Sequence, residues 1–230
     1  MTLGGLLIKL RLLTNLFNNR WGQVFLGFIL FIGLGTVYSY GILRVEIERE
    51  LSIKSTLSGL PYITSLFFYA ISMFFSGKYL THYNPSKTMI VGSILVAIGW
   101  VLSGFASNIL LLTLSYGLIM GTGVGIVYGI PIIVIPKWFT KQKGLAVGLI
   151  LAGFGLSPLL TAPLTQLAID QIGLSNTFLT FGIVFGILLP LLSSLFHLPK
   201  ETYIQDSNQP SILSETSLKQ GVFGLYILTF

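Results

Sequence analysis

The sequence contains no cysteine, few charged residues and only two histidines. Without cysteine it can form no disulfide framework, thiolate metal site or redox pair. Asp, Glu, Lys and Arg together make up 9% of the 230 residues, whereas an ordinary soluble domain contains about 25%. A soluble core of this size would need a charged surface to stay dispersed, so the composition excludes an ordinary soluble fold.

Apolar residues take the place of the missing charges. They make up 53% of the chain and fall in long runs that short polar stretches separate. Six of these runs are long enough to cross the roughly 30 Å hydrocarbon core of a bilayer as helices, at about 1.5 Å per residue. We therefore predict an all-α membrane protein with spans at approximately residues 21–43, 57–80, 88–106, 109–135, 145–169 and 175–198.

The predicted spans form one bundle over residues 21–198, and three further segments flank it. Residues 1–20 are basic, and their cations interrupt what would be the apolar core of a signal peptide, so we expect a cytoplasmic segment at the interface. A mitochondrial-type presequence is the alternative. The polar residues 199–217 predict a cytoplasmic linker, and the apolar residues 218–230 predict the start of a seventh helix.

Lysine and arginine are distributed unevenly over the breaks between the predicted spans. One side of the membrane receives ten of them, whereas the other receives only Arg44, Arg49 and Lys54. The positive-inside rule then places the N-terminus in the cytoplasm of a multi-pass protein of the cell membrane. The formal net charge of +6 accordingly indicates topology and contact with lipid, and not binding to nucleic acid.

Glycine recurs at every fourth position in two of the predicted spans. The residues are Gly117, Gly121, Gly125 and Gly129 in the fourth span, and Gly144 and Gly148 at the start of the fifth. Such ridges let helices approach closely, and smooth interfaces also suit helices that rock against one another. The first span is also rich in glycine, which favours two inverted three-helix repeats with equivalent first and fourth spans.

The spans offer hydroxyl groups but no catalytic or metal-binding set. His82 and His197 lie at span ends without neighbouring ligands, and no nucleophile has a base within reach in the spans. We therefore expect no enzyme activity, no cofactor and no metal. Tyr38 and Tyr128 lie in the inner parts of glycine-rich spans, where a phenol needs a partner, so they are candidates to line a polar cavity and donate to a substrate oxygen.

Several motifs share their order and spacing with a known family. They are Asn19-Arg20-Trp21, Gly35 through Tyr40, Gly121 through Gly129, Pro136 through Gly148 and Ala152 through Leu156. Together they resemble the oxalate/formate antiporter branch of the major facilitator superfamily, which is similar to monocarboxylate transporters. The resemblance covers residues 19–200, and its most specific stretch is residues 121–156.

This resemblance implies the N-terminal six-helix half of a twelve-helix carrier that moves small carboxylates by alternating access. It places the family's aromatic cavity residues at Tyr38 and Tyr128, with Tyr40 at a position where tryptophan is usual. It also places the cationic substrate-binding residues in a C-terminal half outside this sequence. We expect the cavity to be completed by a separate second half, by a homodimer, or by the rest of a longer chain of which this one is a truncation.

The loop after the second span departs from the pattern of the family. In the stretch from Gly77 through His82 to Lys87, Thr81 replaces an acid that the resemblance implies holds the inward gate. This loss favours the alternative of a membrane scaffold or regulatory half-transporter that does not transport. Val37 also replaces a polar amide of oxalate-handling relatives, so we predict small organic anions as the substrate class and not oxalate in particular.

Overall fold

The computed structural model describes residues 19–79 and 84–199 of the chain. The predicted N-terminal segment up to residue 18, Thr81 and His82 of the predicted gating loop, and the predicted linker and seventh helix from residue 200 onward lie outside the described residues. Within the described ranges the chain forms helices and no strand. The prediction of an all-α membrane protein is therefore confirmed.

The first span is one helical run over Arg20–Leu51. It consists of α2 (Arg20–Leu34), the 3-10 segment η1 (Gly35–Ser39) and α3 (Tyr40–Leu51). The run continues past the predicted end at residue 43 because Arg44 pairs with Glu48, at 3.0 Å, across the polar last turns of α3. It ends at Ser52, whose left-handed φ of 51° closes the helix.

The next three spans follow the predicted ranges to within a few residues. The second contains α4 (Ser55–Ser58) and α5 (Leu60–Tyr79), and the third is α6 (Pro85–Gly104). The fourth begins with α7 (Ile109–Leu112) and the π-helical segment η2 (Thr113–Met120). It continues with α8 (Gly121–Val134) and the 3-10 segment η3 (Ile135–Trp138). Asn84 caps α6, because its side chain accepts a 3.0 Å hydrogen bond from the Ser86 backbone N–H. Asn108 caps α7 in the same way through the Leu111 N–H.

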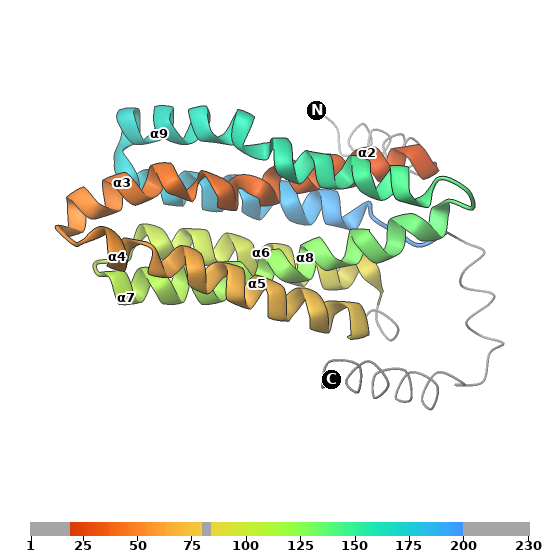
Figure 1. Ribbon diagram of the computed structural model, residues 1–230, viewed down its shortest axis with the longest axis horizontal. Helices are drawn as coiled ribbons and strands as arrows, with labels where there is room; N and C mark the ends of the chain where they lie inside the picture. The colour runs from red at the N-terminus through yellow and green to blue at the C-terminus, as the bar shows by residue number, and fades with distance from the viewer. Residues whose placement is uncertain (1–18, 80–83, 200–230) are drawn as a thin grey trace, which may run out of the picture. The chain divides into compact units, whose positions relative to one another are not determined.

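The fifth and sixth spans lie within the 52 residues of α9 (Lys143–Ser194). Gly173 interrupts α9 with φ 78° and ψ 170°, a conformation that is essentially restricted to glycine. The chain reverses there, so residues 143–172 and 174–194 form two separate spans, drawn in cyan and blue in Figure 1. This break falls inside the predicted gap between residues 169 and 175.

The helices of the compact unit that ends at His197 pack in contacting pairs. In this unit α9 packs against α2 and α6, and α5 packs against α8 (Figure 1). Trp100, Tyr116 and Phe178 fill the interior, where each is at most 1% exposed. Their rings meet edge to face or at a tilt, at centroid distances of 5.4 to 6.2 Å.

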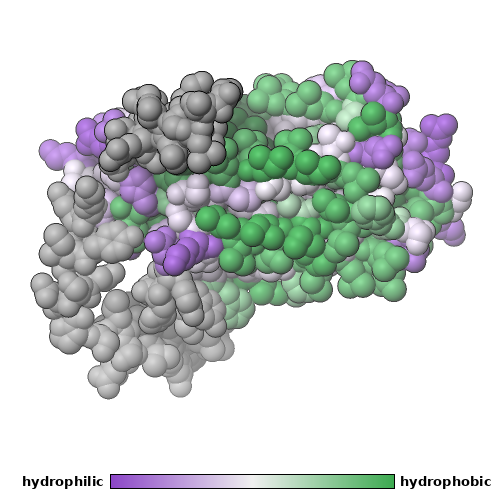
Figure 2. Space-filling model, turned by 180° about the vertical axis from the view of Figure 1, so that it is seen from behind, coloured by the Kyte–Doolittle hydropathy of each residue, from purple (hydrophilic) through white to green (hydrophobic). Residues whose placement is uncertain are grey.

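The surface of this unit is apolar between its two ends. Phe74 and Leu159 are each 73% exposed, and Ile187 is 68% exposed. Figure 2 shows such side chains across the middle of one face, with hydrophilic side chains gathered toward both ends. Lipid can cover apolar side chains of this kind, because a helix satisfies most of its backbone groups internally.

Candidate functional site

Tyr38 of η1 and Tyr128 of α8 meet around one ring of α9. The Phe154 ring centroid lies 5.1 Å from that of Tyr38 and 4.9 Å from that of Tyr128. Tyr69 of α5 lies 5.1 Å from Tyr128, and Phe31 of α2 stacks on Tyr128 at 4.6 Å. These five residues, which we call the aromatic cluster, bring together four membrane spans.

The position of Tyr38 depends on how closely η1 approaches α9. A Cβ at Gly35 would lie 2.5 Å from both the Phe154 carbonyl oxygen and the Ser157 Cβ, so only glycine fits there. The Ser39 hydroxyl also lies 2.7 Å from that of Thr161 on α9. Because η1 turns more tightly than an α-helix, it changes the direction of the side chains within the span. Tyr38 is 47% exposed, although both of its neighbours are buried.

The tyrosine hydroxyls of the aromatic cluster differ in their partners. The rings of Tyr69 and Tyr128 meet edge to face at 5.1 Å, so their hydroxyls lie near each other. The Tyr38 hydroxyl makes no hydrogen bond with any residue that the structure describes. A phenol can donate to a carboxylate without placing a charge in the membrane, so Tyr38 has a donor to offer.

Tyr38 lines two cavities of different size. The inner one, beside Tyr69 and Phe154, has a volume of about 10 Å³, and one water needs about 10–15 Å³. The other has a volume of about 230 Å³, and its walls include Tyr38, Tyr62 and Arg44. In this arrangement the aromatic cluster is closed around its own side chains, and the nearby space for a small molecule lies in the larger cavity beside Tyr38.

Tyr40 has a different position from Tyr38. It is 2% exposed, and its hydroxyl donates a 2.7 Å hydrogen bond to the Ser58 carbonyl oxygen. Its ring packs between those of Tyr62 and Tyr116, at 5.7 and 5.0 Å. A phenol has a single proton, so Tyr40 has none left for a substrate here. Its predicted role in binding stays a prediction, whereas its contacts in the structure join α3 to the start of the second span.

The glycine ridge on the fourth span lies directly against α5. A Cβ at Gly117 would lie 2.7 Å from the Thr64 Cβ, and one at Gly121 would lie 2.6 Å from the Ser65 carbonyl oxygen. Cβ atoms at Gly125 and Gly129 would likewise meet the α5 backbone or the Ser76 hydroxyl. The ridge therefore sets the separation of α5 and α8, which carry Tyr69 and Tyr128 of the aromatic cluster.

The second predicted ridge does not pack in the same way. Cβ atoms at Gly144 and Gly148 would meet nothing within 4 Å among the described residues, and both glycines are exposed. Close packing at these two positions, which the spacing predicted, is therefore absent from the bundle that the structure describes. A packing role for them stays a prediction that requires a further surface.

A polar network lies at the end of the bundle opposite to Arg44. The described part of the predicted gating loop lies at the same end. Gly77 lies near the end of α5, and Lys87 is exposed on the first turns of α6. The Gln23 side chain donates to the Leu195 carbonyl oxygen at 3.1 Å. The Trp138 indole donates to the His197 carbonyl oxygen at the same distance. This network joins the first, fourth and sixth spans at one end.

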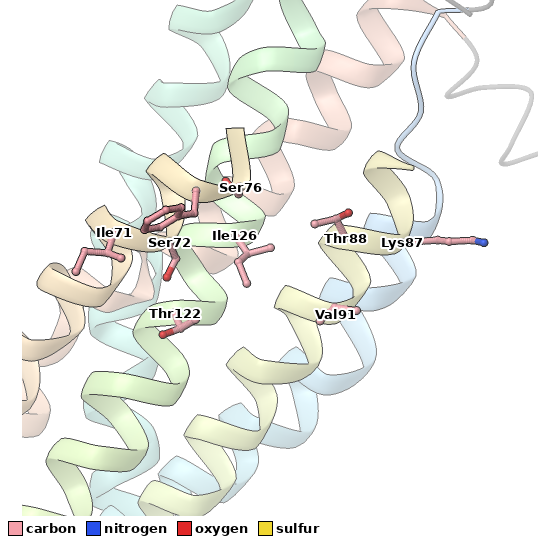
Figure 3. A pocket seen from close by; sticks show the side chains of 9 residues that line it. Ile71, Ser72, Ser76, Lys87, Thr88, Val91, Thr122 and Ile126 are labelled. Carbon is pink, nitrogen blue, oxygen red and sulfur yellow. The ribbon is translucent and has the colours of Figure 1, made fainter. Parts of the chain in front are cut away.

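A further cavity lies between α5, α6 and α8 and has a volume of about 480 Å³ (Figure 3). Ile71, Val91 and Ile126 are among its walls. The hydroxyl of Ser72 on its wall bonds to the carbonyl oxygen of its own helix at Phe68. Figure 3 shows Lys87 pointing away from the cavity. An apolar groove without a directed cation suits a lipid chain better than a carboxylate.

Comparison with known proteins places this arrangement in a family. The Major Facilitator Superfamily matches residues 12–229 of the chain. The chain belongs to the major facilitator superfamily. It is a multi-pass membrane protein of a transporter family and not an enzyme, and it corresponds to the N-terminal portion of the major facilitator fold.

Several relatives within the superfamily have names that refer to transport. The chain is 27% identical over 209 residues to the oxalate:formate antiporter of Oxalobacter formigenes, covering 90% of this chain and 49% of that protein. It is 36% identical over 104 residues to monocarboxylate transporter 11 of Homo sapiens, covering 45% and 22%. It is 25% identical over 179 residues to the uncharacterized MFS-type transporter YhjX of Escherichia coli (strain K12), covering 75% and 44%. The chain thus spans about half of these relatives' length, or less.

Proposed function

We propose that this major facilitator chain carries small organic anions, specifically small carboxylates, across the cell membrane by alternating access. The observation that carries the proposal is the meeting of Tyr38 and Tyr128 around Phe154, with the Tyr38 hydroxyl unpaired among the described residues. The names of an oxalate:formate antiporter and of a monocarboxylate transporter among its relatives support a carboxylate as the substrate.

The chemistry of binding follows from the two phenols. A carboxylate has two oxygen atoms that accept hydrogen bonds, and Tyr38 and Tyr128, whose rings both contact Phe154, can each supply one O–H donor. The apolar rings around them keep water away, which strengthens each hydrogen bond to a charged acceptor. With only about 10 Å³ beside the aromatic cluster, the helices must separate before a carboxylate can enter.

The movement that opens the aromatic cluster is a rocking of this bundle against a second surface. A separate six-helix half or a second copy of this chain would supply that surface, and the exposed face with Gly144 and Gly148 suits close contact with it. The distribution of Lys and Arg supports a cytoplasmic N-terminus, with Arg44 at the outer end.

A scaffold or regulatory half-transporter that does not transport is the second candidate. The observation that favours it is Thr81, which stands where the family pattern has an acid in the gating loop. A protein that no longer opens and closes has no need of that acid. The two candidates differ in one measurable property, which is movement of solute.

The test is uptake of radiolabelled formate, acetate, lactate and oxalate by vesicles that contain the purified chain. We expect saturable uptake that falls about tenfold or more in Tyr38→Phe and in Tyr128→Phe, because each variant loses one hydrogen bond to a charged group. Tyr116→Phe is the matched control, since its hydroxyl is fully buried and lines neither cavity beside Tyr38. Inserted protein with no uptake above empty vesicles would contradict transport by this chain on its own, and would leave a half that needs a separate partner or a scaffold.

A further inference from the structure

The larger cavity beside Tyr38 has the size and the walls of a binding site in its own right. Its volume of about 230 Å³ is many times the 10–15 Å³ or so that one water needs, so it holds a small carboxylate. Its lining residues come from the first span and the start of the second, and are Tyr38, Tyr40, Gly41, Arg44, Gly59 and Tyr62. Tyr38 also lines the inner cavity, so it belongs to both.

Arg44 is the cation of this cavity, and its side chain is held in place. Its Nε donates to Glu48 Oε1 at 3.0 Å and to Ser58 Oγ at 2.9 Å, and its Nη2 donates to the Ser55 carbonyl oxygen at 2.5 Å. Its Nη1 makes no hydrogen bond with any described residue. A guanidinium fixed on one edge loses little freedom when its other donors bind a carboxylate.

The charge of Arg44 is only partly neutralised by Glu48. The Glu48 carboxylate also accepts hydrogen bonds from the Ser55 and Ser58 hydroxyls, at 3.0 and 2.5 Å, so its negative charge is shared among three donors. The side chains of Arg44 and Glu48 are 39% and 28% exposed, and water weakens their attraction. This combination produces a weak, accessible anion site.

We infer that Arg44 and the cavity beside Tyr38 form a second carboxylate site, where the substrate binds before it reaches the aromatic cluster. The inference rests on the proposed transport of carboxylates and adds the site of first capture. A substrate anion held by Arg44 lies next to Tyr38, whose hydroxyl then receives it as the helices separate. Weak binding suits this step, because a tightly held anion does not move on.

The test is direct binding of radiolabelled lactate to the purified chain in detergent, which does not depend on transport. We expect Arg44→Gln to weaken binding about tenfold, the loss of one hydrogen-bonded charge at a partly exposed site. Glu48→Gln removes the same ion pair but keeps the cation, so it should bind lactate as tightly as the parent chain or more tightly. Lactamide, which has no charge, should compete poorly with labelled lactate.

The outcomes separate a binding role from a structural one. Equal weakening in Arg44→Gln and Glu48→Gln would mean that the pair only stabilises the fold, and unchanged binding in Arg44→Gln would also overturn the inference. Thermal unfolding of both variants checks that they are folded. If the vesicles show no uptake while lactate binding still depends on Arg44, the transport proposal fails and the Arg44 site stands.

Discussion

Replacement of Gly121 by alanine tests whether the glycine ridge sets the distance between α5 and α8. The new Cβ would lie 2.6 Å from the Ser65 carbonyl oxygen and 2.8 Å from the Ser65 Cα. Carbon atoms in good contact are about 3.5–4.0 Å apart, so the two helices must separate by about 0.7 Å or more. The obstacle is backbone, which cannot turn aside as the end of a side chain can.

The magnitude follows from two opposing effects. Overpacking of a tight interior typically costs about 1–3 kcal/mol. Alanine is also the better helix former, by about 1 kcal/mol relative to glycine in a helix interior. Gly148→Ala should gain the helix stability of alanine without the cost of overpacking, because a Cβ there meets nothing within 4 Å among the described residues. We therefore expect Gly121→Ala to be less stable than Gly148→Ala by about 1–3 kcal/mol.

The assay is equilibrium unfolding of both variants in mixed micelles, followed by circular dichroism. Uptake measured in parallel adds a functional reading, because separation of α5 from α8 moves Tyr69 away from Tyr128, whose rings are 5.1 Å apart. We expect Gly121→Ala to lose uptake. Equal stability of the two variants would refute the argument that backbone contact at Gly121 holds the helices together.

Two further substitutions test local features of the fold. Tyr116→Phe should stabilise the chain by about 1 kcal/mol, since the Tyr116 hydroxyl is buried without a hydrogen-bond partner among the described residues, and thermal unfolding in detergent would measure the gain. A midpoint of thermal unfolding below that of the parent chain would mean that the hydroxyl has a hydrogen-bond partner. Gly173→Ala should lower the free energy of unfolding by about 1–3 kcal/mol, because alanine is strained at φ 78°. Unchanged stability in the same unfolding assay would mean that another backbone conformation at this position serves equally well.

The spans could be predicted from hydropathy alone because a bilayer demands long apolar helices. Their ends were harder to predict. Residues 44–51 continue the first helix through pairs such as Arg44 with Glu48, and a search for apolar runs does not register such pairs. The reversal at Gly173 was foreseen as a gap, but its φ could not be, since glycine is common throughout these spans and most of them are helical.

The candidate site was predicted only in part. Proximity of Tyr38 and Tyr128 followed from the family resemblance, whereas Phe31, Tyr69 and Phe154 look like ordinary core residues in the sequence. Residues two apart on a helix face different directions, so the sequence held a signal that Tyr38 and Tyr40 would not both belong to the aromatic cluster. The glycine spacing predicted close helix approach but could not say which helix would supply the neighbour.

The charges around the aromatic cluster argue for a further surface during transport. None of its five residues is a cation, and moving a carboxylate out of water costs several kcal/mol even after the protein relaxes. Each of two phenols contributes about 1.5–3 kcal/mol through a hydrogen bond to a charged group. Together they offset little more than the cost of desolvation, so little or no net binding free energy remains. Arg44 belongs to the larger cavity beside Tyr38 and is partly neutralised by Glu48. A carboxylate centred on the aromatic cluster therefore needs another donor or cation, and the proposed second half or second copy is where the bundle leaves room for it.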